Sequence, residues 1–245
     1  MSIRPLLPFC LVLFDLLAPS PAMAEEYSPR TWIAALPAPP TVYGADCEWA
    51  ALDARAEAEA AKAQAAAVAS ASIGAGSMAV SDAQGAAIEA LTSERVTQCP
   101  MGFVDAQMQV EAALDASQRK VAGWVSVRYA ARDACPHVVG FPEAGCVARV
   151  DREFLARAEA EVRHVIGSEV QPRLRRFDAD IAACIGDREA AAKKARDAGV
   201  TAGPFAGIVA SMPMMDWQLA ASAMALHRRS CEYVQTALAD FQIQQ

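Results

Sequence analysis

The three histidines of this 245-residue chain, His137, His164 and His227, are its first candidates for metal or acid–base chemistry. Glu161-x-x-His164 has the spacing of the Glu-x-x-His element of di-iron helical bundles, in which two residues three apart on one helix both reach the metal. Such a site uses the element twice, and this chain contains it once. The sequence therefore favours an ordinary surface pair at Glu161 and His164 over a metal site.

His227 and a run of methionines are the other candidate ligands. His227 lies in a heptad pattern beside Cys231, which predicts a packed, partly buried histidine, with a pH-sensitive or ligand-binding role as the alternative. Met212, Met214 and Met215 bring together thioethers that suit Cu(I), although methionine also commonly fills protein cores. No cofactor is expected, and whether these residues bind a metal stays open.

The sequence contains one partial match to a catalytic motif. Ser117-x-x-Lys120 has the spacing of the serine and lysine of penicillin-binding enzymes, but the Ser-Asp-Asn and Lys-Thr-Gly elements that accompany them are missing from the sequence. The chain also contains no Gly-x-Ser-x-Gly, His-Glu-x-x-His, Cys-x-x-Cys or phosphate-binding glycine loop. We therefore assign no catalytic residue and expect a protein that is not an enzyme.

The cysteines carry the clearest chemical signal. Beyond residue 24 the chain has an even set, which in an exported protein predicts disulfides. The set is Cys47, Cys99, Cys135, Cys146, Cys184 and Cys231. Spacing favours pairing Cys135 with Cys146 and Cys184 with Cys231, which leaves Cys47 for Cys99. If Cys47 and Cys99 flank one helical turn, they lie at unequal distances from it by roughly 10 Å, more than a disulfide spans, so other pairings stay open.

Two apolar stripes position Cys184 and Cys231. The C-terminal stripe repeats every seven residues in two registers, as in a helix packed along a partner. Its members are Trp217, Met224, Cys231 and Leu238, with Ala220, His227, Val234 and Phe241. The upstream stripe consists of Val170, Leu174, Phe177, Ile181 and Cys184. With a connection over 200–213, the two stripes predict an antiparallel hairpin stapled by Cys184 and Cys231.

The segment from Cys47 is a helix rich in alanine, with a predicted small-residue seam. The seam runs through Cys47, Ala54, Ala61 and Val68, with Ala51, Ala58 and Ala65. Ser81-x-x-Gln84 matches a capping box that opens a second helix, which would complete a hairpin.

Further helices are expected downstream. One runs from about 103 to 132, and one covers 147–198 with a kink or break near Ser168, because Pro172 removes a backbone hydrogen bond. Gly199 is the expected stop of that helix.

The segment 63–81 carries no charge until Ser81 and is rich in Ala, Ser and Gly. We interpret it as the tip of the first hairpin and as the candidate partner-binding surface. The candidate residues are Ser70, Ser72, Ile73, Gly74, Gly76 and Ser77. Its hydrophobicity is too low for a spanning helix. A protein contact is favoured here, with membrane contact at the tip as the open alternative.

The N-terminus has the form of a signal peptide. Arg4 precedes a largely apolar run, and Ala22-Met23-Ala24 matches a cleavage site, which predicts removal of residues 1–24 and a periplasmic or secreted protein. The net charge of -7 argues against a nucleic-acid partner.

The domain organisation follows from these features. Residues 25–46 form a Pro-rich extended strap, 47–132 a helical hairpin plus a third helix, 133–146 a disulfide-closed loop and 147–245 a kinked long helix and a C-terminal helix. Residues 47–245 are expected to form one domain.

The fold class expected is therefore all-α, an elongated helical bundle of two disulfide-stapled antiparallel hairpins. The function expected is that of an exported, non-enzymatic interaction or structural protein, for example a component or adaptor of a bacterial envelope assembly, with a protein partner there. A periplasmic metal- or small-ligand-binding bundle and a secreted inhibitor or effector of a cell-wall enzyme or membrane are the alternatives. The oligomeric state is left open.

Overall fold

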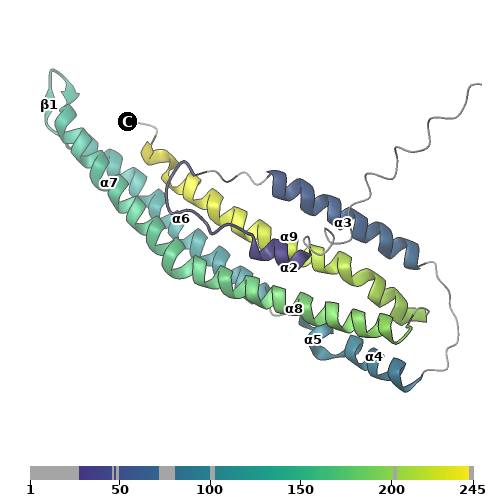
Figure 1. Cartoon of the computed structure of the whole chain (residues 1–245). Helices are drawn as coiled ribbons and strands as arrows, with labels where there is room; N and C mark the ends of the chain where they lie inside the picture. Colours follow the sequence, from purple (N-terminus) through teal and green to yellow (C-terminus); the bar gives the residue numbers. More distant parts are fainter. Residues whose placement is uncertain are drawn as a thin grey trace, which may run out of the picture.

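The computed structural model describes residues 28–45, 47, 50–71, 81–99, 103–200 and 203–242, and helices dominate these residues (Figure 1). The elements, in chain order, are α2 (Pro29–Ala34), α3 (Ala50–Ala71), α4 (Asp82–Thr92), α5 (Glu94–Thr97), α6 (Phe103–Asp133), β1 (His137–Val138), β2 (Phe141–Pro142), α7 (Ala144–His164), the π-helix η3 (Val165–Val170), α8 (Gln171–Asp197) and α9 (Gly203–Gln242). The all-α class is confirmed. The helices form an elongated bundle, with the β1–β2 ribbon at one end and α4 at the other (Figure 1).

Helices α8 and α9 are the two elements against which most others pack. Every residue of the predicted heptad stripe of α9, from Trp217 to Phe241, is buried. The stripe of α8 faces it and is also buried. The two helices are antiparallel, because Asp178 pairs with His227 while Arg188 pairs with Asp216.

Helices α7 and α8 continue into one another through η3, and together they flank α6 and α9 (Figure 1). The helix is interrupted where the sequence predicts a kink or break, near Ser168. However, the chain stays helical there and only widens into a π-helical turn. Pro172 in the first turn of α8 cannot donate the usual backbone bond to Ser168, and a π-turn accommodates such a misfit without ending the helix. The buried Val165, Ile166 and Val170 keep this turn packed against the bundle.

The predicted hairpin of the 47–132 segment is wrong. Helix α3 packs along α9, whereas α4 packs against α8 at the far end of the bundle. The capping box at Ser81 and Gln84 is confirmed: Gln84 N donates to Ser81 Oγ at 3.3 Å, and Ser81 N donates to Gln84 Oε1 at 3.0 Å. A correct helix start therefore says nothing about which helix is its neighbour.

The predicted alanine seam of α3 is also wrong. Ala54 and Ala61 are exposed and Val68 is 68% exposed, while Ala56 is buried, with Ala60 and Ala63 partly buried against the core. The contact face is shifted by two positions, about 200° around the helix. Alanine occupies both faces, so its spacing cannot indicate which face is buried.

The structure corrects two of the three predicted disulfides. Cys135 pairs with Cys146 as expected, but Cys47 pairs with Cys231 and Cys99 with Cys184. The pairs Asp178–His227 and Arg188–Asp216 fix the register of α8 on α9. In that register Cys184 lies about ten residues, or roughly 15 Å along the axis, from the level of Cys231. A bond between Cys184 and Cys231 would exceed the reach of a disulfide.

The turn between α8 and α9 explains the misjudged register. Gly199 ends α8 at a φ of +73° as predicted, and Val200 N donates to Ala195 O at 2.9 Å in the manner of a Schellman cap. However, α9 begins at Gly203 and continues through Pro213, so the expected connection over 200–213 is mostly helix. Because this turn is shorter than expected, every residue of α9 lies opposite a different residue of α8 from the one that the sequence predicted.

The N-terminal strap is more structured than expected, because α2 forms within it. Trp32 and Ile33 of α2 are buried in the main core, where Trp32 meets Trp217 edge to face at 6.1 Å between ring centroids. Farther along the strap, Gln171 Nε2 donates to Pro39 O at 3.2 Å, and Gly44 N donates to Gln235 Oε1 at 2.8 Å. The strap therefore packs on the bundle's own helices.

Three disulfides indicate that the chain folds in an oxidising, extracytoplasmic environment. No helix in the part of the chain that the structure describes is long and apolar enough to span a bilayer.

Candidate functional site: an apolar hairpin at the end of the bundle

The predicted partner-binding surface lies almost wholly outside the described residues. Ser70 lies in the last turn of α3, and its side chain is not described. Ser72, Ile73, Gly74, Gly76 and Ser77 fall in the range 72–80, which is likewise outside them. A partner contact at this segment stays a prediction.

The histidines are not brought together. His137 and His164 are exposed on different elements, and His227 is buried. His227 Nδ1 lies 3.0 Å from Pro37 O, and Nε2 lies 2.9 Å from Asp178 Oδ2, so this ring joins the strap to α8. Among the described residues, no group of three or more His, Cys, Asp or Glu side chains could hold a metal ion.

The methionine run serves the core. Met212 is buried and Met215 partly buried in a second apolar cluster that α4, α5, α8 and α9 share. Leu91 and Val96 lie in the same cluster. The packing role that the sequence favours for these methionines therefore has contacts to support it.

Ser117 and Lys120 belong to a polar network that the sequence did not predict. Tyr233 donates a hydrogen bond of 2.6 Å to Ser117 Oγ, and Ser117 Oγ lies 3.3 Å from Glu161 Oε1. Lys120 Nζ pairs with the other oxygen of Glu161 at 2.6 Å. Ser117 is only 2% exposed, so its hydroxyl is covered and held by its partners. The arrangement fits a structural link between α6, α7 and α9.

The surroundings of Tyr233 shift the pKa of its hydroxyl. Burial raises the pKa of its hydroxyl above 10.0, its ordinary value; the hydrogen bond to Ser117 opposes the rise, and the negative charge of Glu161 adds to it. The phenol therefore stays neutral and can donate to Ser117 over a wide pH range.

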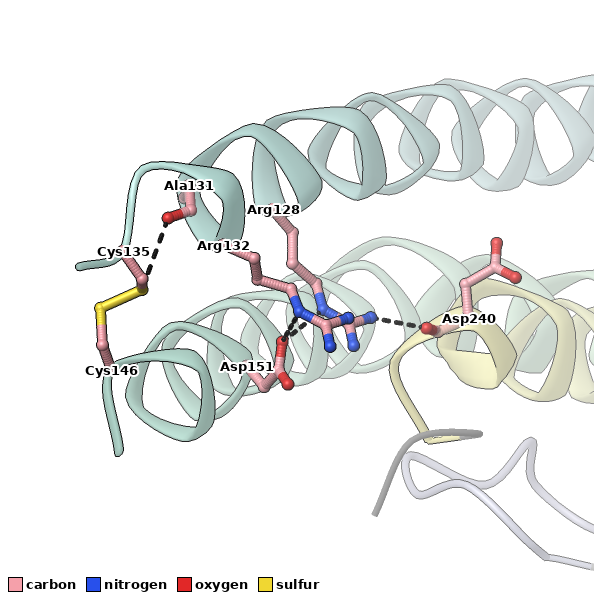
Figure 2. Close-up of polar contacts among 7 residues, drawn as sticks. All are labelled: Arg128, Ala131, Arg132, Cys135, Cys146, Asp151 and Asp240. Carbon is pink, nitrogen blue, oxygen red and sulfur yellow. Dashed lines mark hydrogen bonds and ion pairs between the residues drawn. A yellow bond between two sulfur atoms is a disulfide. The ribbon is translucent and has the colours of Figure 1, made fainter. Parts of the chain in front are cut away.

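A second buried network fixes the end of the bundle (Figure 2). Arg128 Nε donates to Asp151 Oδ1 at 2.8 Å, and its Nη1 donates to the backbone oxygen of Asp240 at 2.7 Å. Arg132 Nε lies 3.7 Å from the same Asp151 oxygen. One guanidinium thus joins α6, α7 and the end of α9. Just beyond it, the Cys135–Cys146 disulfide joins the end of α6 to the start of α7 (Figure 2).

The chain between these two cysteines folds into a short hairpin, which we call the apex and define as residues 136–142. His137 pairs with Pro142 and Val138 with Phe141 across the ribbon. Val139 and Gly140 form the turn, at φ values of +53° and +89°. Positive φ at both central positions is the geometry of a type I′ turn, whose usual residues are Asn-Gly, Asp-Gly and Gly-Gly.

Val139 is an unusual choice for this turn. A β-branched residue at positive φ is strained, and such strain gathers at functional sites. It is also 93% exposed, so burial of its side chain contributes little to offset the strain. Its neighbours Val138 and Phe141 are 59% and 76% exposed. The apex lies at the very end of the bundle (Figure 1), and it therefore exposes several apolar side chains there.

A shallow hollow lies beside the apex. Its volume is about 540 Å³, and residues of α6, the apex and α7 line it. Phe141 and Tyr129 supply aromatic rings, and Arg132 and Asp133 supply one charge of each sign. This end of the molecule thus combines an apolar projection with a partly polar rim.

From the sequence, this segment is predicted only as a disulfide-closed loop, with no function assigned to it. A signal was present: residues 134–142 contain no Asp, Glu, Lys or Arg, and Val-Val-Gly-Phe stands in their middle. A loop this short, closed at its base by a disulfide, cannot bury such a run of apolar side chains within itself.

The chain matches no protein-family model, no curated protein and no solved structure.

Proposed function

We propose that this chain is an exported, non-enzymatic interaction protein, a disulfide-braced helical arm that presents the apex as its contact surface. The observation that carries the proposal is Val139, which is 93% exposed at a φ of +53°. Strain and exposure of an apolar side chain both cost stability, and a contact made only in a complex accounts for both. A component or adaptor of a bacterial envelope assembly would need such an arm.

Export is supported by two independent features. The N-terminal residues have the composition of a secretory leader, with Ala22-Met23-Ala24 as its cleavage site. All six remaining cysteines are paired, which suits an oxidising compartment. We therefore place the protein in the periplasm or outside the cell.

The non-enzymatic assignment is supported by what the chemically capable side chains do. Ser117 is covered by Tyr233 and Glu161, and His227 is held between Pro37 and Asp178. These contacts join elements of the bundle. No observation among the described residues favours the ligand-binding bundle or the secreted inhibitor over this proposal.

A photo-crosslinking residue at position 139 tests the proposal in the cells that make the protein. Position 104 is the matched control, because Val104 is also an exposed valine, at 55%, and lies at the other end of α6 from the apex. We expect adducts from position 139 that position 104 does not give. Equal adducts from both positions, or none from position 139, would remove the apex as the contact surface.

A further inference from the structure

We infer that the apex contacts the surface of a lipid bilayer, into which Val138, Val139 and Phe141 insert. This inference rests on the proposed function, since it names the partner of the same surface. It concerns insertion of a loop into one leaflet and needs no spanning helix.

The side chains that project from the apex are apolar and carry no acidic or basic groups of Asp, Glu, Lys or Arg. Val138, Val139 and Phe141 expose large apolar surfaces together, and residues 134–142 carry no carboxylate, ammonium or guanidinium group. Charged groups are what make entry into a bilayer costly. A convex apolar projection without them can leave water without carrying a charge into lipid.

The second argument concerns the backbone. Unpaired N–H and C=O groups are the other main cost of entering lipid. Strands β1 and β2 pair with each other, and Glu143 N donates to Pro136 O at 2.7 Å across the base of the hairpin. Pro136 and Pro142 have no N–H to satisfy. The apex therefore meets much of its backbone hydrogen-bonding need internally.

The third argument is preorganisation. The Cys135–Cys146 disulfide closes the base of the apex, and Arg128 fixes the helices beneath it through Asp151 and Asp240 (Figure 2). A contact surface that is already ordered loses little conformational entropy on binding. The arrangement suits a rigid wedge.

The last turns of α6, directly beneath the apex, carry side chains that suit the level of lipid head groups. Tyr129 is 46% exposed, and the guanidinium of Arg132 lies 5.8 Å from the centre of its ring. Tyrosine and arginine side chains are favoured at the level of lipid head groups, where an apolar body and a polar end can both be satisfied. They lie six and three residues before Cys135, which is about one to two helical turns below the disulfide.

The size of the apex favours lipid over protein. A stable protein interface uses about 20–30 residues on each side. The apex has three strongly exposed apolar side chains and a mixed hollow beside them, which is too little for such an interface alone. Insertion into a bilayer needs no matching area, because each apolar group contributes as it leaves water.

Charge determines which membrane the test should use. The chain has a net charge of -7, so attraction to anionic lipids does not drive the contact. We therefore expect binding to vesicles of phosphatidylcholine alone, changing little between about 50 and about 500 mM NaCl, because salt screens electrostatic but not apolar contacts.

The experiment is vesicle flotation of the secreted, oxidised chain with phosphatidylcholine vesicles, the N-terminus being checked by intact mass. Val139→Asp should lower the partition coefficient about tenfold or more, since it removes one inserted side chain and adds a charge. Val104→Asp places the same change on another exposed valine, at the far end of α6, and should leave the partition coefficient unchanged. Circular dichroism confirms that both variants are folded.

The outcomes separate this inference from the proposed function. Flotation that Val139→Asp abolishes and Val104→Asp preserves supports the bilayer contact. If the parent chain does not float, or both variants float equally well, the bilayer contact is wrong. A discrete protein adduct from position 139 together with absent flotation would overturn the lipid partner while leaving the apex as a contact surface. Absence of both results would overturn both.

Discussion

Arg188 of α8 and Asp216 of α9 form a buried ion pair, with 3.2 Å between Nη1 and Oδ1 and both side chains 5% exposed. Arg188 Nε also donates to the backbone oxygen of Val96 at 3.2 Å. This guanidinium thus joins α5 to the α8–α9 hairpin near the second apolar cluster. Removing one partner of such a pair leaves a buried charge without compensation, which is strongly destabilising.

The pair predicts a specific pH dependence. Burial raises the pKa of Asp216 from 3.8 to about 6, although Arg188 acts in the opposite direction. Because the folded-state pKa lies above the unfolded value, the folded chain binds the extra proton between these two values. The contribution of Asp216 to stability is therefore complete below pH 3.8 and is lost as pH rises through about 6.

The comparison that isolates this effect is the parent chain against Asp216→Asn, by urea unfolding at about pH 3, 5 and 7. The difference in unfolding free energy, parent minus variant, should fall by about 3 kcal/mol over that range. A difference that stays constant, or that rises with pH, would contradict the assigned pKa direction.

The turn of the apex gives a second prediction. Val139→Asn places a residue that tolerates positive φ in a type I′ turn before Gly140, so we expect the unfolding free energy to rise by about 1 kcal/mol. The same change at Val138, which lies in β1, relieves no strain and should give no gain. Thermal unfolding of the two variants provides the measurement. If Val139→Asn destabilises the chain, the strain assigned to this turn is wrong.

A gain in stability on losing Val139 would also bear on function. Stabilising substitutions that a natural sequence has not adopted are commonly found where stability is given up for activity. The same variant should then contact its partner less well than the parent chain.

How far the sequence predicted the fold depended on the size of the side chains in each pattern. The seam of α9 contains Trp217, Met224, Leu238 and Phe241, whose burial is favourable enough to decide which face packs inward. Helix α3 has alanine on most faces, so no spacing could select its contact face. The predicted seam was accordingly wrong by two positions.

The predicted disulfide pairing was wrong for a different reason. Pairing Cys184 with Cys231 required the helix register, which depends on where the intervening turn lies. The glycines and Pro213 suggested a long connection, but tertiary packing of Val209 and Met212 keeps that segment helical. The exposure of the apex was not predicted, because the spacing of the two cysteines indicates only a closed loop and does not show that its valines have no core to enter.

The corrected pairing gives a third prediction. The Cys47–Cys231 bond spans 184 residues and the Cys135–Cys146 bond spans 11. Loop-closure entropy predicts that replacing the first pair by serines costs about 5 kcal/mol and replacing the second about 3 kcal/mol. Denaturant unfolding of the two double variants tests the order. A peptide linking Cys184 to Cys231 in a non-reducing digest would contradict the pairing itself.

The central claim is that the apex meets the partner, and carbene footprinting in intact cells tests it most directly. Trypsin cleaves after Arg132 and Arg149, so one peptide, 133–149, contains the whole apex. The peptide 63–95, which follows Lys62 and ends at Arg95, contains the whole uncharged segment 63–81 that the sequence first suggested. The account predicts lower labelling of 133–149 in cells than in the purified chain, with 63–95 labelled equally in both. Protection of 63–95 with 133–149 unchanged would contradict it and move the contact surface to the alanine-rich segment.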